Sequence, residues 1–263
     1  MNFCKVKDGK LYTPVIGYRR NETDVSVIGT IHIGLSSYYQ SLQRELDRHS
    51  RGFFEGIKLV CDESRVSSDK KDYISDLKKM SDVYRTFAKY LGMESQRDSL
   101  SYGGGWENPD MTLDEFITAL PHKLLERISG LRKNVIKFEE YHERNPAELA
   151  RIWKTVGLSL YKYPFLHKYI SRLFFSPMYR KVILSQRNQR LFDEMQPKLD
   201  SLEDLGVIYG AAHLEGIDRY LRRNGFEREG EYWITAWEIF DDEPPFYRSW
   251  RNFLRDVFKD NLD

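Results

Sequence analysis

Two segments that lie far apart in the chain have the same design, and this repetition restricts the folds available to it. The segments 27–32 and 207–213 each combine an apolar run with the pattern Gly-x-x-His. In both cases the residues that follow show the apolar spacing of a helix. A repeated strand, turn and helix predicts an internal duplication, in which two β-α-β units contribute to one central sheet.

The two halves of the predicted sheet come from the two ends of the chain. Each half should supply a strand, a helix and a second strand, because alternating or short apolar runs flank a stretch of helical period. The first half is 1–66 and the second is 203–263. The expected strands are 25–29, 53–60, 206–210 and 232–240, and the expected helices begin near Ser36 and Leu214.

The middle of the chain, 67–202, has mostly helical spacing and is predicted to be an all-helical insertion or cap between the halves. Asn145-Pro146 is a typical helix start within it. Near the end of the chain, apolar residues from Phe246 to Phe258 recur at helical spacing and predict a terminal helix. The predicted fold class is therefore α/β with α+β character, as one domain covering residues 1–263.

Charge balance and cysteine content restrict the partners and the compartment. The chain has 41 basic and 40 acidic residues, so its net charge of +1 gives no overall attraction to nucleic acid or acidic membranes. Cys4 and Cys61 are too few for a disulfide framework. The most apolar region, 153–179, is interrupted by charges and prolines and predicts no transmembrane segment. We expect a cytoplasmic protein without a signal peptide that binds no nucleic acid, and the pattern favours no particular oligomeric state.

His32 and His213 are the first candidates for a functional site. Ligands bind beyond the carboxyl ends of the strands in open α/β sheets, and both histidines lie where the chain leaves its strand. A single Gly-x-x-His is a weak pattern, and a lone histidine of this kind is more often a buried, hydrogen-bonded residue or a helix cap. The same pattern twice at the same topological place favours one shared crevice.

Three polar residues interrupt apolar patterns and are further candidates. Glu55 lies within the apolar run 53–57, and a buried carboxylate needs a cation, a metal or a cluster of donors. Arg187 interrupts an apolar helix face, so it should meet a carboxylate or an anionic group of a ligand. Asn188 offers an amide donor to the same place. The alternatives are an outward position on an edge strand for Glu55 and a polar helix edge for the other two.

Other patterns are interpreted as structural. The segment 102–106 is rich in glycine but lacks the lysine and hydroxyl residue of a phosphate-binding loop, which indicates a turn. The aromatic residues between Trp153 and Phe175 are more typical of a cap core than of a nucleic-acid stacking platform. The remaining histidines, which lack ligand spacing, are His49, His122, His142 and His167.

Together these motifs resemble the TraB/Tiki superfamily of proposed metallohydrolases, which also takes in GumN-like proteins and, more distantly, erythromycin esterases and ChaN haem-binding proteins. The resemblance covers nearly the whole chain. Its strongest parts are 27–34 with Tyr38-Tyr39, 54–56, Arg187-Asn188 and 209–213, and the segments 106–112 and 233–237 are similar to bacterial members.

The resemblance implies that His32, Glu55, Arg187 and His213 form the catalytic or metal-binding set, with Asn188 as a further member. It also implies two duplicated halves that clasp a helical insertion. The sequence departs from the Tiki branch because it shows no signal peptide and no membrane anchor, which argues against an extracellular protease.

The residue set suggests two mechanisms for hydrolysis of an amide or ester bond in a peptide or small molecule. Two histidines and a carboxylate, His32, His213 and Glu55, are a common ligand set for zinc, manganese or cobalt and leave a position for water. Arg187 and Asn188 would then stabilise the oxyanion or clamp the substrate. Without a metal, Glu55 would orient His32 as a general base.

Two non-hydrolytic interpretations stay open. One is a regulatory protein that binds a peptide without cleaving it. The other is a haem or iron carrier of the ChaN kind, which would use an exposed tyrosine or histidine as a ligand, and Tyr38 or Tyr39 could serve.

Overall fold

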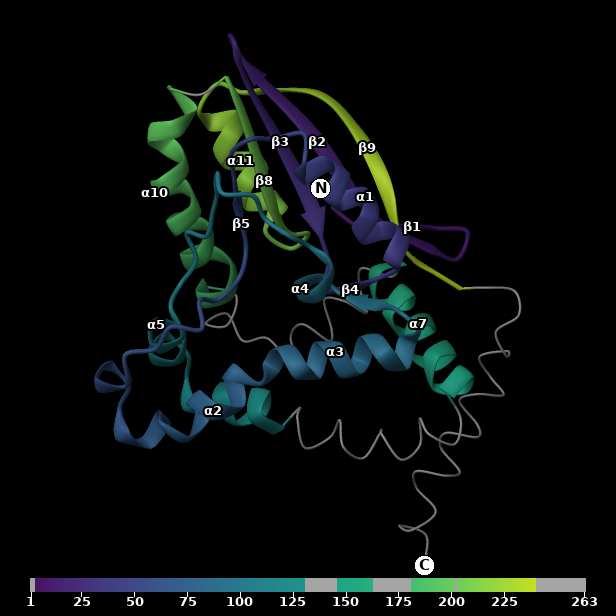
Figure 1. Cartoon of the computed structure of the whole chain (residues 1–263), viewed down its shortest axis with the longest axis vertical. Helices are drawn as coiled ribbons and strands as arrows, with labels where there is room; N and C mark the ends of the chain where they lie inside the picture. The colour runs from purple at the N-terminus through teal and green to yellow at the C-terminus, as the bar shows by residue number, and fades with distance from the viewer. Residues whose placement is uncertain (1–2, 131–145, 163–180, 202, 240–263) are drawn as a thin grey trace, which may run out of the picture.

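A mixed sheet places the two Gly-x-x-His segments on neighbouring strands (Figure 1). The computed structural model describes residues 3–130, 146–162, 181–201 and 203–239. Strand β3 (Thr23–Thr30) pairs in parallel with β8 (Asp204–Gly210), and Ile28 lies opposite Ile208. The prediction of an α/β fold is confirmed, with the two repeated strands side by side at the centre of the sheet.

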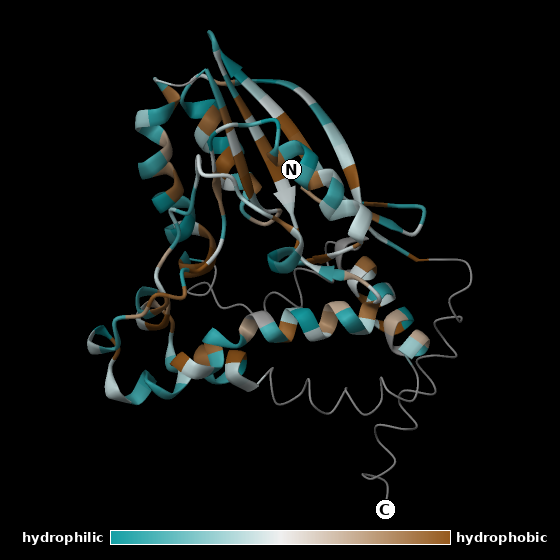
Figure 2. Cartoon of the chain, in the orientation of Figure 1, coloured by the Kyte–Doolittle hydropathy of each residue, from teal (hydrophilic) through white to brown (hydrophobic). Residues whose placement is uncertain are grey.

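Seven strands of the described residues form this sheet, with β1-β2-β3-β8-β5-β7 as the order and β9 paired to β2. Strands β3, β8, β5 and β7 are mutually parallel, whereas β2 is antiparallel to β3 and to β9. The central strands have the most hydrophobic composition (Figure 2), as is typical of parallel strands covered on both faces. The remaining bounds are β1 (Lys5–Lys7), β2 (Lys10–Arg20), β5 (Gly52–Phe54), β7 (Trp106–Glu107) and β9 (Glu227–Glu238).

Helices cover both faces of the sheet. On one face, α1 (Ser36–Leu46) buries Tyr38, Leu42 and Leu46 against Ile28 and Ile208. On the other face, α10 (Arg187–Leu199) and α11 (Leu214–Arg223) pack against the alternate side chains of β3 and β8. Each fully buried side chain of this size contributes about 1.5–3 kcal/mol to folding. The helices that follow β3 and β8 therefore lie on opposite faces and enclose the sheet between them.

A second hydrophobic core lies below the sheet in Figure 1 and belongs to the insertion. The helices and short strands described outside the main sheet and its covering helices are α2 (Asp72–Lys78), α3 (Met80–Leu91), α4 (Gln96–Ser99), α5 (Leu113–Ala119), α7 (Pro146–Lys162), the 3-10 turns Glu63–Arg65 and Ser68–Lys70, and the strands β4 (Ile33–Gly34) and β6 (Glu94–Ser95). Of these, α2 and α5 contribute most to the second core. The insertion is not purely helical, because β7 joins the main sheet and β6 pairs with β4. Helix α10, which was assigned to the insertion, packs on the sheet instead.

Two strands differ in extent from the sequence prediction. The strand expected at 53–60 ends at Phe54, because Ile57 and Cys61 turn away to pack in the core of the insertion. The apolar residues of this run therefore pack in two different cores, and the sequence pattern does not show which residues belong to which core. The last strand, expected from 232, begins at Glu227 and pairs along β2. The terminal helix expected from Phe246 lies outside the described residues.

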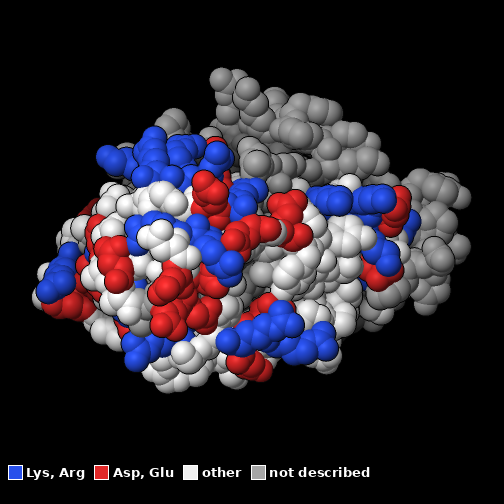
Figure 3. Space-filling view, turned by 90° about the horizontal axis from the view of Figure 1, so that it is seen from above, with Lys and Arg blue, Asp and Glu red and all other residues white. Residues whose placement is uncertain are grey.

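Charged side chains of both signs are interspersed over the face seen in Figure 3. Ion pairs at the surface of the described residues include Arg19 with Asp24 and Arg20 with Asp200. This mixing agrees with the balanced composition. Among the helices built from described residues, none has both the length and the apolar composition needed to cross a bilayer.

Candidate active site

Three candidate side chains follow three adjacent parallel strands. His32 comes after β3, His213 after β8 and Glu55 directly after β5, and β8 lies between the other two strands. Because these strands are parallel, their carboxyl ends meet at one edge of the sheet, the edge at which α/β folds bind ligands. The fold therefore brings residues that are up to 181 positions apart in the sequence to the same edge.

Glu55 is the centre of the polar cluster, and its side chain is only 6% exposed. Its Oε1 lies 2.7 Å from Nη2 of Arg187 and 3.3 Å from Nε2 of His213. Its Oε2 accepts a hydrogen bond of 2.5 Å from the backbone N–H of Gly210. Burial alone would raise the pKa of Glu55, but the positive charges of His213 and Arg187 outweigh it and hold the pKa well below the usual value. Glu55 is therefore a buried, ionised carboxylate.

Arg187 bridges Glu55 to a second buried carboxylate, Asp110. The guanidinium Nε and Nη2 of Arg187 donate to Asp110 at 2.9 Å and 2.5 Å. Asp110, whose side chain is 0% exposed, also accepts hydrogen bonds from the backbone N–H groups of Gly56 and Met111 at 3.0 Å and 2.8 Å. Two carboxylates around one guanidinium fix its plane and compensate its burial.

Asn188 fixes the ring of His213. The side-chain Nδ2 of Asn188 donates to the backbone oxygen of His213 at 3.3 Å, and its Oδ1 lies 2.6 Å from the ring Nδ1. Both ring nitrogens of His213 thus face oxygen acceptors, Asn188 on one side and Glu55 on the other. Gly216 on α11 permits the contact, because a β-carbon there would collide with the amide of Asn188.

Arg187 and Asn188 are the first two residues of α10, and a π-helical segment, Lys181–Gln186, precedes them. Neighbouring residues on a helix point about 100° apart, so Arg187 reaches the two carboxylates while Asn188 reaches His213. Short π-helical segments occur frequently at functional sites, where they adjust the side chains that follow.

His32 is the exposed member of the group. Its Nδ1 lies 3.2 Å from Oε1 of Gln96, and its backbone oxygen accepts a hydrogen bond of 2.9 Å from the N–H of Gln96. Its ring lies 4.8 Å from the ring of Tyr84 on α3. A proton on Nδ1, donated to Gln96, leaves the lone pair of Nε2 directed elsewhere. The charge of His32 also lowers the pKa of Glu55, which places the ring near that carboxylate.

The structure thus brings four of the five candidates, Glu55, Arg187, Asn188 and His213, into a continuous chain of contacts, and places His32 beside them without a direct bond to them. Sequence reasoning missed Asp110 as a site residue. Two signals pointed toward it: it lies in the segment 106–112 that resembles bacterial family members, and Arg187 was expected to need a carboxylate.

The tyrosines considered as haem ligands are not exposed. Tyr38 and Tyr39 are 0% and 1% exposed, and they pack in the core under α1. Their hydroxyl groups bond to the backbone oxygens of Gly29 and Ile31, and Tyr38 also contacts Thr13. The expectation that they are exposed is wrong, because the helical period that positions them also faces them to the sheet.

The donor set is compatible in kind with a metal ion. His32 and His213 each have Nδ1 against an amide oxygen, of Gln96 and Asn188, and metal-binding histidines are commonly oriented in this way. On Glu55, however, Oε1 already contacts the guanidinium of Arg187. In the part of the chain that the structure describes, no three His, Cys, Asp or Glu side chains are grouped as metal ligands would be.

Comparison with known proteins gives no match, because no family model, no curated protein and no solved structure is significantly similar to this chain.

Proposed function

We propose that this protein is a hydrolase of amide or ester bonds, related to the TraB/Tiki superfamily as its motifs suggest. The observation that carries the proposal is the buried, ionised Glu55 held between Arg187 and His213 at the carboxyl ends of three parallel strands, with the exposed His32 beside it. Buried charges at such a strand edge are typical of catalytic sites.

His32 is the best candidate for the general base. It is exposed, and its contact with Gln96 leaves Nε2 with a lone pair that can remove a proton from water. The hydroxide oxygen then attacks the carbonyl carbon, and the departing amine or alkoxide takes the proton when the bond to carbon breaks. This role differs from the expectation that Glu55 would orient His32, because Glu55 contacts His213 and Arg187 instead.

Arg187 is the best candidate for stabilising the developing oxyanion. Its Nε and Nη2 are engaged by the carboxylates, whereas its Nη1 has no hydrogen-bond partner among the described residues. A donor that is rigidly held yet free at one nitrogen suits a charge that appears only in the transition state. The ring of His213, which Asn188 orients, contacts the same carboxylate of Glu55 through Nε2.

A metal-assisted form of the same reaction is the second candidate, favoured by the Nδ1 contacts of both histidines with amide oxygens. In that form Nε2 of His32, Nε2 of His213 and a Glu55 oxygen would hold manganese, cobalt or zinc. Such an ion supplies a Lewis acid that lowers the pKa of a bound water. Arg187 would keep its contact with Asp110 and its role toward the oxyanion.

We also propose that the protein acts in the reducing cytoplasm, since Cys4 and Cys61 are both free.

The test is hydrolysis of a panel of p-nitrophenyl esters and fluorogenic peptides, first in a chelator and then with added manganese, cobalt or zinc. His32→Ala is the most informative variant because the ring is exposed, so its loss should leave the urea midpoint unchanged while turnover falls by about 100-fold or more. His122→Ala is the matched control, since His122 is 45% exposed and contacts Glu126 and Tyr73 on the insertion.

Each outcome separates the candidates. Turnover in the chelator that is lost in His32→Ala supports the metal-free hydrolase. Turnover that needs an added ion, with ion binding lost in His32→Ala, supports the metal form. A wild-type protein that hydrolyses no member of the panel under any condition contradicts the proposal and favours a peptide-binding protein without catalysis. An absorbance band of haem in the purified protein would favour the carrier.

A further inference from the structure

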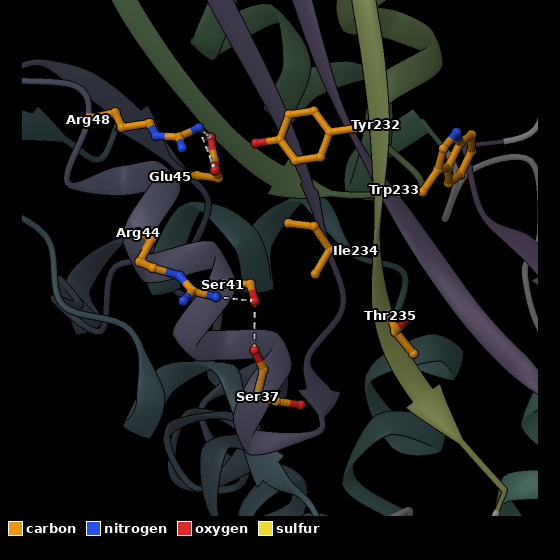
Figure 4. Close-up of a pocket in the computed structure, with 9 residues that line it drawn as sticks. All are labelled: Ser37, Ser41, Arg44, Glu45, Arg48, Tyr232, Trp233, Ile234 and Thr235. Atoms are coloured by element: carbon orange, nitrogen blue, oxygen red, sulfur yellow. Dashed lines mark hydrogen bonds and ion pairs between the residues drawn. The ribbon is translucent and has the colours of Figure 1, made fainter.

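A hollow of about 460 Å³ lies between helix α1 and strand β9, on elements that the proposed hydrolysis does not use (Figure 4). Its helix side carries serine and arginine side chains, and its strand side is the stretch 232–235. Figure 4 shows Tyr232 and Ile234 directed from β9 toward α1. The hollow therefore has one wall of helix side chains and one wall of strand.

The helix wall is a single row with one uncompensated positive charge. Ser37, Ser41 and Arg44 are spaced by three or four positions, so they share one side of α1, and Arg48 follows just beyond the end of the helix. Arg48 donates to both oxygens of Glu45 at 2.8 Å and 2.9 Å, which neutralises that pair. Arg44 donates to Oγ of Ser41 at 3.0 Å and has no carboxylate partner among the described residues.

The strand wall presents backbone groups without partners. Pro14 on β2 lies opposite Trp233 and has no amide hydrogen, which indicates a non-hydrogen-bonded position in this antiparallel pair. The N–H and C=O of Trp233 therefore point away from β2, as do those of Thr235, because the direction alternates along a strand. The N–H of Leu35 bonds to the Ala236 oxygen on this outer edge, but no described residue bonds to the backbone of Trp233 or Thr235.

We propose that this hollow binds an extended peptide segment that carries acidic side chains, as an added strand on the outer edge of β9. The free N–H and C=O groups of Trp233 and Thr235 would pair with the peptide backbone, as in other cases of strand addition. Arg44 would pair with a carboxylate of the peptide, and the hydroxyl groups of Ser37 and Ser41 lie along the same row. Because the lining contains two arginines and one glutamate, the net charge of the hollow is positive.

The shape and the charge favour this occupant over others. A free strand edge recognises a backbone that alternates donors and acceptors, which a nucleic acid does not offer. A second copy of β9 is unsuited, because each copy carries the glutamates Glu227, Glu229, Glu231 and Glu238 but only one arginine, Arg228, so two such strands repel each other. An acidic segment of another chain, placed at 232–235 between those glutamates, meets the positive part of the groove.

The experiment is fluorescence anisotropy with a labelled eight-residue peptide in which glutamate alternates with valine, added to the intact protein at low salt. Two control peptides separate the contributions of charge and backbone. In the first, lysine replaces each glutamate. In the second, alternate amides carry N-methyl groups, which keep the charges but remove half of the backbone donors. We expect the glutamate peptide to bind at least tenfold more tightly than either control.

Two protein variants test the two walls independently. Arg44→Glu reverses the free charge and should weaken binding of the glutamate peptide by about tenfold, whereas Arg97→Glu, on α4 outside the lining, should not change it. Thr235→Pro removes an outward N–H, a change that edge strands tolerate, and should also weaken binding by about tenfold. Thr235→Val, which keeps the N–H, is its matched control.

Peptide binding at this hollow does not depend on the proposed hydrolysis, so the binding results alone can overturn it. Equal binding of the glutamate and lysine peptides, or no binding of either, overturns the charge assignment. Equal binding of the N-methylated peptide overturns the strand addition, even if Thr235→Pro does not fold. A single-stranded oligonucleotide that competes as well as the unlabelled glutamate peptide would show a general anion site and would equally overturn it.

Discussion

The buried charge cluster makes a quantitative prediction for Asp110→Asn. This substitution keeps the size of the side chain but leaves the Arg187 guanidinium with one carboxylate, Glu55, in place of two. The new amide must also turn an N–H toward either the guanidinium or the backbone N–H groups of Gly56 and Met111. Removing one partner of a buried ion pair typically costs about 3–5 kcal/mol, because the remaining charge is not solvated.

The assay is urea unfolding, monitored by circular dichroism. With an m value of roughly 3 kcal/mol/M for a chain of this size, a loss of this magnitude lowers the midpoint by about 1–1.7 M. Asp98→Asn is the matched control, since Asp98 is 43% exposed and bonds to Arg85, an exposed pair that contributes roughly 0–1 kcal/mol. If Asp110→Asn shifted the midpoint no more than Asp98→Asn does, the guanidinium would be solvated and the buried cluster would be disproved.

Three further predictions concern the rest of the fold. The pKa of Asp98 is lowered to about 2 by hydrogen bonds with an arginine and a serine, so the small stability difference between wild type and Asp98→Asn should be present above pH 4 and disappear as the pH falls to about 2 in urea titrations. Native protein should react with a thiol reagent at Cys61 well before Cys4, because burial raises the pKa of Cys4 to about 12 and leaves it 7% exposed. Gly52→Ala should destabilise the protein by about 1–3 kcal/mol, since its β-carbon would lie 2.5 Å from a backbone oxygen of β8. Gly104→Ala is the control and should be neutral, because no atom lies within 4 Å of the added β-carbon.

The sequence predicted the sheet best where local and tertiary preferences agree. The helices Ser36–Leu46 and Leu214–Arg223 begin where they were expected, because their apolar stripes are the faces that pack on the sheet. The Asp8-Gly9 turn also has the positive φ angles, 48° and 70°, that this dipeptide favours. In these elements the apolar residues that make the sequence pattern are the same residues that pack on the sheet.

Prediction was weakest where one segment contributes to two parts of the fold. The run after Phe54 is apolar because Ile57 and Cys61 pack in the insertion, so the run looks like a longer strand than it is. Trp106 joins the sheet from within the insertion, and its ring fills the space left by Gly52 and Gly206. Neither contact leaves a local pattern, since both depend on segments that are distant in the sequence.

The candidate site shows the same limit. His32, Glu55 and His213 were identifiable because each directly follows a strand, but the partners of each histidine were not. Gln96 and Asn188 bond to the two rings and come from the insertion and from α10. Asn188 was a candidate because it lies beside Arg187, but its local sequence does not show that it contacts His213, and Gln96 was not a candidate. Asp110 belongs to the same category, because its carboxylate becomes part of the cluster only through the fold.

The two Gly-x-x-His segments contain similar histidines, but the structure gives them different surroundings and therefore different capacities. His213 is 3% exposed and lies between the Asn188 amide and the Glu55 carboxylate, so each of its two ring nitrogens faces an oxygen acceptor. His32 is exposed and has one acceptor, Gln96, which leaves its second nitrogen free. The proposed hydrolysis needs one fixed positive charge, which Arg187 would supply, and one group that exchanges protons with water. The difference between the two histidines suits His32 for the second role, so we expect that exchanging the Gln96 contact for an apolar one would impair His32 while leaving the His213 cluster intact.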